Sequence, residues 1–194
     1  TTQLGKILNV FDGKITADNI SKLGNAIVDI ANKGVATGGF IVDFTQRLSG
    51  VAKTAGISLE AILGLGAGLE ENGAKVEASS TAIQKLLLKI GSDVPNAAKI
   101  AGKNIKEFSD LLANKPQEAL LAYASGLVKN TAAFEEFSAS LKESGDDQAR
   151  VAPIIALLGT KTDFFKQKIE ETGAALKSTE AITEGFAIKN TNLG

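Results

Sequence analysis

Cysteine and histidine are both absent from the 194 residues of this chain. Without cysteine, the chain can form neither a disulfide nor a thiolate metal site. Without histidine, it lacks the usual general base and the commonest metal ligand, and a Ser-His-Asp triad is impossible. Tryptophan is absent too, and aromatic residues make up only 5% of the chain, so a core must be built mainly from Leu, Ile, Val, Ala and Phe. We therefore expect no catalytic, cofactor or metal site, and a protein that is not an enzyme.

A strong net charge and long apolar runs are missing as well. The 21 basic and 22 acidic residues give a formal net charge of −1, so no global field attracts a polyanion. The basic residues form no stripe, which argues against specific nucleic-acid binding. The longest apolar runs, at 61–69 and 151–158, are less than half of the roughly 20 residues needed to span a bilayer. No signal peptide is visible. The chain begins with Thr1 and contains no methionine, so we expect an excised or processed piece of a longer protein.

What the sequence does contain is a series of apolar residues spaced three and four apart, which predicts amphipathic helices. Hydrophobic residues make up 44% of the chain, enough for one sizeable core. No stretch alternates with the period of two that is typical of strands. The sequence therefore predicts an all-α fold, a compact array of about ten short helices with Gly- and Pro-rich breaks and no sheet. We assign residues 1–177 to a helical core module and residues 178–194 to a partly helical or frayed tail.

Several residues are expected to mark where helices begin and end. Thr16 is a candidate cap for one helix, and Gly34 is expected to end it. Pro95 suits the first turn of another helix, capped by Ser92 or Asp93. Three further expectations concern the last third of the chain: a cap at Thr131, a capping box at Thr160 and Asp163, and a late start or kink at Pro153.

The stretch 51–90 is rich in small residues and contains two amphipathic segments joined at Gly73. Because the connection is short, we expect each segment to cover the apolar stripe of the other. The first segment contains Gly64, Gly66 and Gly68, and each glycine weakens a helix interior by roughly 1 kcal/mol relative to alanine. These glycines are therefore expected to let the helix backbone approach a neighbour closely.

Two patterns could suggest chemistry. Residues 64–69 are glycine-rich like a nucleotide-binding loop, but Leu69 stands where the third glycine of G-x-G-x-x-G belongs and no strand precedes it. Adjacent carboxylates could act as acid and base, although charged residues are mostly solvated. We expect solvated helix ends or faces at four such pairs: Glu70-Glu71, Glu135-Glu136, Asp146-Asp147 and Glu170-Glu171.

An ordered series of motifs runs through the chain. The central ones are Ala52, Gly56-Ile57-Ser58-Leu59-Glu60, Glu70-Glu71-Asn72-Gly73 and Ala78-Ser79-Ser80-Thr81-Ala82-Ile83-Gln84-Lys85-Leu86-Leu87, and others lie at 19–28, 40–48, 105–108 and 156–159. In order and spacing, from about residue 4 to residue 175, the series resembles phage tail tape-measure proteins. The chain departs from the family pattern near Ser79-Ser80, where glycine is frequent.

The resemblance implies a structural protein of a phage or prophage. Tape-measure proteins set tail length during assembly, occupy the lumen of the tail tube and leave with the genome at infection. A helix can measure length because it rises 1.5 Å per residue. Because glycine and proline divide this chain into short helices, we expect a compact module within a longer tape-measure protein, and not the ruler itself.

The resemblance also implies partners and a location. The partners would be other tape-measure copies in a homo-oligomer, tail-tube or tail-tip proteins, assembly chaperones and, at infection, the host membrane. The location would be the lumen of the virion tail, after assembly in the cytoplasm of the bacterial host.

Two other classes of function stay open. One is a membrane-active helical protein that inserts its amphipathic, glycine-rich hairpin into lipid. The other is an all-helical enzyme that uses carboxylates and lysines, which the absence of histidine and cysteine disfavours.

Overall fold

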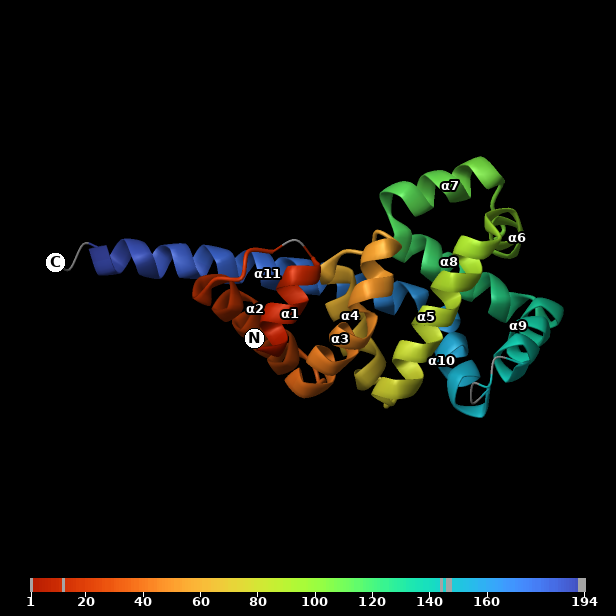
Figure 1. Ribbon diagram of the computed structural model, residues 1–194, viewed down its shortest axis with the longest axis horizontal. Coiled ribbons are helices and arrows are strands. Elements are labelled where there is room, and N and C mark those ends of the chain that lie inside the picture. The colour runs from red at the N-terminus through yellow and green to blue at the C-terminus, as the bar shows by residue number, and fades with distance from the viewer. Residues whose placement is uncertain (1, 12, 144, 146–147, 192–194) are drawn as a thin grey trace.

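The computed structural model describes residues 2–11, 13–143, 145 and 148–191. In this part of the chain there are eleven α-helices and no strand, which confirms the all-α prediction (Figure 1). The helices are α1 (Gln3–Val10), α2 (Ala17–Lys33), α3 (Gly38–Thr54), α4 (Leu59–Glu71), α5 (Val76–Ser92), α6 (Val94–Ile100), α7 (Ile105–Asn114), α8 (Pro116–Lys129), α9 (Thr131–Glu143), α10 (Gln148–Thr160) and α11 (Thr162–Thr191). Helix α11 continues through residues 177 and 178, and the division of the chain at that point stays a prediction.

Two helices begin at the caps that the sequence predicts. At the start of α2, the hydroxyl of Thr16 accepts a hydrogen bond from the N–H of Asn19 at 3.1 Å. At the start of α6, the carboxylate of Asp93 accepts from the N–H of Asn96 at 3.0 Å, with Pro95 in the first turn. Both caps satisfy N–H groups that have no partner within the helix.

Other predicted boundaries are wrong. Thr160 is the last residue of α10, and its hydroxyl donates to the carbonyl of Ala156 at 2.8 Å, so it does not cap α11. Asn130, and not Thr131, caps α9, because its side-chain oxygen accepts from a first-turn N–H of that helix. A complete capping box occurs instead at Asn104, where α7 begins.

Proline and glycine act differently from the expectation at two further places. Helix α10 begins at Gln148 and continues through Pro153, so the predicted late start is wrong, whereas the alternative of a kink stays a prediction. The hydrogen bond that Pro153 cannot donate would go to Ala149 in the first turn of the helix. Gly34 directly follows α2 as predicted, but its backbone is extended (φ −126°) and not left-handed. A side chain at Gly34 would meet the carboxylate of Glu71, so this glycine provides space.

Helix α4 lies at the centre of the fold, with every residue from Ala61 to Leu69 buried. Its side chains enter two hydrophobic clusters. Leu65 belongs to the larger cluster, which extends through α5, α8 and α10, and Leu63 belongs to a smaller cluster with α1 and α2. Helix α4 therefore joins the two cores.

The expectation that α4 and α5 cover each other is wrong. Helix α4 packs mainly against α11 and α3, whereas α5 packs mainly against α3 and α10. Figure 1 shows α11 running from the middle of the molecule past α1 and α2. In this chain the short connection between α4 and α5 does not make the two helices pack along their length, and helices that are distant in the sequence cover their faces.

The glycines of α4 do allow close packing, as the sequence predicts. A Cβ atom at Gly64 would lie 2.7 Å from the backbone Cα of Ile169 in α11, closer than atoms in contact can approach. Gly66 faces an aromatic ring of α3, and Gly68 faces the ring of Phe165 in α11. Glycine at these positions lets α3 and α11 contact the backbone of α4 directly.

Candidate functional site

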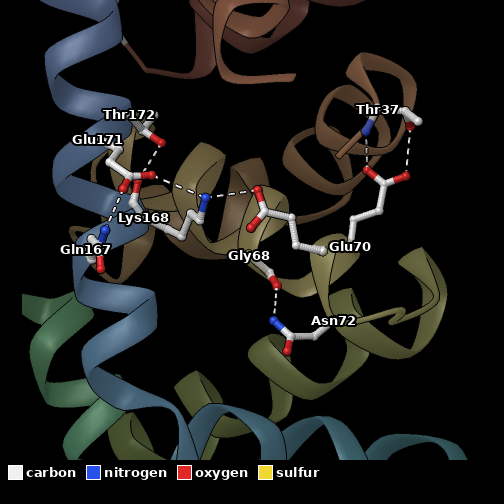
Figure 2. A network of polar contacts seen from close by, with 9 residues as sticks. Thr37, Gly68, Glu70, Asn72, Gln167, Lys168, Glu171 and Thr172 are labelled. Atoms are coloured by element: carbon white, nitrogen blue, oxygen red, sulfur yellow. Dashed lines mark hydrogen bonds and ion pairs between the residues drawn. The ribbon is translucent and has the colours of Figure 1, made fainter. Parts of the chain in front are cut away.

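Three polar residues, Glu70, Glu71 and Asn72, lie at the C-terminal end of α4, and the last turn of this helix has no basic residue. The helix macrodipole makes a C-terminal end negative, so an exposed carboxylate there is unfavourable by about 0.3–1 kcal/mol. Contacts with other segments must compensate for this. Three distant segments supply those contacts, most of which are drawn in Figure 2.

Glu70 binds the N-terminal end of α3. One carboxylate oxygen accepts from the N–H of Thr37 at 2.6 Å, and the other accepts from the Thr37 hydroxyl at 2.8 Å (Figure 2). The same hydroxyl accepts from the N–H of Phe40 at 3.3 Å and so caps α3. Because the N-terminal end of a helix is positive, the Glu70 carboxylate is favourable in this position and attaches α3 to α4.

Glu71 binds the second turn of α11. Its carboxylate accepts from the Lys168 ammonium at 3.0 Å, and the two side chains are 12% and 16% exposed. The same ammonium lies 3.2 Å from Glu171 and 5.7 Å from the centre of the Phe164 ring. Lys168 is therefore held between two carboxylates and beside an aromatic face, a position that favours a cation.

The pKa values of this group follow from its contacts. Burial alone lowers the pKa of Lys168, but the hydrogen bonds and charges of Glu71 and Glu171 outweigh burial and raise the pKa above its ordinary value. The pKa of Glu171 is lowered, first by the hydrogen bond from Gln167 and then by Lys168, against the opposing effect of desolvation. Both shifts show that the contacts favour the charged forms of Lys168 and Glu171, so the ion pairs persist at neutral pH.

Asn72 binds the junction between α10 and α11. Its side-chain N–H donates to the carbonyl of Gly68 at 2.7 Å, and its side-chain oxygen accepts from the Lys161 ammonium at 2.6 Å. The chain then turns at Gly73, whose φ of +75° is in the left-handed region that favours glycine. We call Glu70, Glu71 and Asn72, together with Thr37, Lys168 and Lys161, the α4-end cluster.

The chemistry available at the α4-end cluster is that of a structural junction. The cavity beside Glu71 and Lys168 has a volume of about 20 Å³, room for about one water molecule and too small for a substrate. Among the described residues, no group of three or more acidic side chains is placed to hold a metal ion. What the cluster can do is fasten α3, α11 and the α10–α11 junction to one end of α4.

The expectation of solvated carboxylate pairs is wrong for Glu71, because this side chain is largely buried against Lys168. It holds for two other pairs, Glu135-Glu136 and Glu170-Glu171, which are exposed. The pair Asp146-Asp147 lies outside the described residues. One signal in the sequence could have identified Glu71: two acidic residues at a negative helix end, without a nearby basic residue, require partners from elsewhere.

The other sequence patterns lie away from any binding geometry. Residues 64–69 are in the interior of α4, where backbone N–H groups take part in the helix and cannot cradle a phosphate. None of the helices within the described ranges is both long and apolar enough to cross a membrane. The apolar faces of α4 are already covered by α3 and α11.

Comparison with known proteins identifies the family to which the chain belongs. No match was found among curated proteins, and none among solved structures. The sequence model of the phage-related minor tail protein family matches residues 1–159. This match covers most of the chain and includes Glu70, Glu71 and Asn72. The chain therefore belongs to the phage-related minor tail protein family.

Proposed function

We propose that the chain is a compact helical module of a tape-measure protein, with a part in tail assembly and length determination inside the tail tube. The observation that carries the proposal is the ordered series of motifs between residues 4 and 175, which resembles that of tape-measure proteins. Membership of a minor tail protein family agrees with it, since that family has a structural role in the phage tail.

The proposed role separates this module from the ruler. As one continuous helix, 194 residues would extend to about 290 Å at 1.5 Å per residue. The helices instead pack against one another, and the longest, α11, has 30 residues and a length of about 45 Å. The length of this folded chain does not follow its residue count, so we assign the measurement of length to continuous helices elsewhere in the protein.

The partners we propose are other copies of the same protein, tail-tube or tail-tip subunits and assembly chaperones. The module would lie in the lumen of the tail after assembly in the bacterial cytoplasm. The role is structural, and we assign the chain no enzymatic reaction.

The test compares two in-frame deletions of equal size in the gene of the full-length tail protein. One deletion removes residues 1–177, and the other removes the same number of residues from a continuous helical segment. Tail length is measured by electron microscopy. We expect the second deletion to shorten tails by about 1.5 Å per residue removed, and the first to reduce the number of complete tails without proportional shortening.

Two results would contradict the proposal. Proportional shortening by the first deletion would show that this module is itself part of the ruler. Unchanged tail length with both deletions would show that the protein does not determine length.

A further inference from the structure

A groove of about 620 Å³ lies between the α6–α7 connection, α8 and the first turns of α11. Its volume is within the range of about 300–1,000 Å³ that is typical of ligand pockets. Two partly exposed apolar side chains, Ile100 of α6 and Leu111 of α7, line part of it, together with the fully buried Leu121 of α8. The polar part includes Ser125 and Thr162. The groove can therefore accept both an apolar and a polar group of the same partner.

The wall of the groove is fixed by a close backbone contact. Gly126 of α8 lies directly against the carbonyl of Ile100, and a Cβ atom at this position would overlap that carbonyl. The chain then reverses at Gly102, whose φ of +69° favours glycine. Because the end of α6 rests on α8 without an intervening side chain, the groove is a preformed feature of the packing.

The charges around the groove are unbalanced. Among the residues that the structure describes, three lysines line it, Lys103, Lys129 and Lys166, against one carboxylate, Glu118. In the described part of the chain, neither Lys103 nor Lys129 has an ion-pair partner. The Lys166 ammonium lies 3.7 Å from Asp163, near the outer limit of an ion pair.

The single carboxylate does not offset these lysines. Glu118 is already paired with Lys115, which lies 2.9 Å from it. The groove thus presents an excess of positive charge, although the whole chain has a net charge of −1. A local excess of this kind selects partners of the opposite sign.

We propose that this groove docks an acidic segment of a partner protein, with an apolar side chain against Ile100 and Leu111 and carboxylates beside the lysines. The inference goes beyond the proposed tape-measure role, because it assigns a contact surface and the chemistry of what binds there. Charge complementarity between the rim and the partner carries it, together with the apolar part of the lining.

A nucleic acid fits the same groove less well. None of the described residues that line it is aromatic, so bases have no surface there on which to stack. This described lining also contains no arginine, and a phosphate backbone would pass the carboxylate of Glu118. The three lysines surround one pocket and form no stripe that could follow a backbone over several phosphates.

The experiment measures binding of a fluorescently labelled peptide, in which glutamates flank two leucines, to the full 194-residue chain by anisotropy. We expect saturable binding that weakens with added salt, because the lysines are exposed. The double variant K103E/K129E should weaken binding by about tenfold or more. The matched control K6E/K14E reverses two exposed lysines away from the groove, and its affinity should stay within about twofold of the wild-type value. Circular dichroism establishes that both variants are folded.

The location is tested separately by nuclear magnetic resonance. On addition of the peptide, we expect the amide signals of Lys103, Ser125 and Thr162 to shift. The proposal is overturned if the wild type shows no saturable binding, or if both double variants lose affinity equally. It is also overturned if a labelled oligonucleotide binds the wild type more tightly than the peptide and loses affinity in K103E/K129E.

Discussion

The carboxylate of Glu71 and the ammonium of Lys168 lie 3.0 Å apart, although 97 positions separate the two residues in the sequence. This contact joins the end of α4 to the second turn of α11, and these two helices have the most extensive packing in the described chain. With side chains only 12% and 16% exposed, neither charge is well solvated if the other is removed. The pair therefore makes the position of α11 depend on α4.

Substitution of Lys168 by methionine should lower the free energy of unfolding by about 2 kcal/mol, between the values of exposed and fully buried pairs. The reason is the partly buried Glu71 carboxylate, which loses its partner. The measurement is equilibrium unfolding in urea. The matched control, Lys166→Met, breaks an exposed contact of 3.7 Å in the same helix and should change stability by less than about 0.5 kcal/mol.

A double variant distinguishes the pair from general damage to α11. Glu71→Gln combined with Lys168→Met removes both charges, so it should be more stable than Lys168→Met alone. If the double variant loses the sum of the two single losses, the residues do not interact and the argument from their distance is wrong.

Replacing glycine by alanine should have opposite effects on stability at Gly64 of α4 and at Gly50 of α3. Gly64→Ala should destabilise the protein by about 2 kcal/mol, because the new methyl group would overlap the backbone of α11 at Ile169. Gly50→Ala, in α3, meets open space and should stabilise by about 0.5–1 kcal/mol through helix propensity. Thermal unfolding of both variants checks this. Equal shifts for the two would mean that α11 does not contact Gly64 closely.

The features that could be predicted from the sequence, such as helix caps, are those that depend on residues close together in the chain. Caps such as Thr16 and Asp93 act within three residues, so local residue types can identify them. Residue type alone does not always fix the position, because Asn130 and not the neighbouring Thr131 caps α9. The glycines of α4 indicated a close neighbour, but an apolar or small-residue face does not say which helix will cover it. The partner of Glu71 is 97 positions away, and no local pattern encodes that pairing.

Ser79 and Ser80 have neighbouring buried hydroxyls, and we expect replacement of the first by alanine to stabilise the protein. The Ser79 hydroxyl is fully buried and has no hydrogen-bond partner among the described residues, whereas the neighbouring Ser80 hydroxyl donates to the carbonyl of Glu77 at 3.1 Å. Because an unpaired buried hydroxyl is unfavourable, Ser79→Ala should raise the free energy of unfolding by about 1 kcal/mol. Ser80→Ala should leave it unchanged or slightly lower in the same urea titration. A loss of stability in Ser79→Ala would show that its hydroxyl has a partner.

The phenol of Tyr123 predicts how stability responds to alkaline pH. Burial, and then the negative charges of Glu136 and Asp93, raise its pKa from 10.0 to about 12. The folded state therefore keeps the phenol neutral at pH values where the unfolded chain ionises it. Stability that is fully present below pH 10 is lost as the pH rises towards 12, and a shift of this size corresponds to about 3 kcal/mol.

Tyr123→Phe isolates this contribution, because phenylalanine keeps the ring and its edge-on contact with Phe137 but cannot ionise. Lysines that lose their charge at high pH, among them Lys168, do so in both proteins, so their effect cancels in the difference. We expect the free energies of unfolding to change in parallel from pH 7 to about pH 9 and to diverge above pH 10, where the wild type loses more. Urea unfolding at a series of pH values measures the difference. Curves that stay parallel to pH 12 would mean that the phenol ionises equally well in the folded and unfolded chains, which is not expected for a buried phenol subject to the negative charges of Glu136 and Asp93.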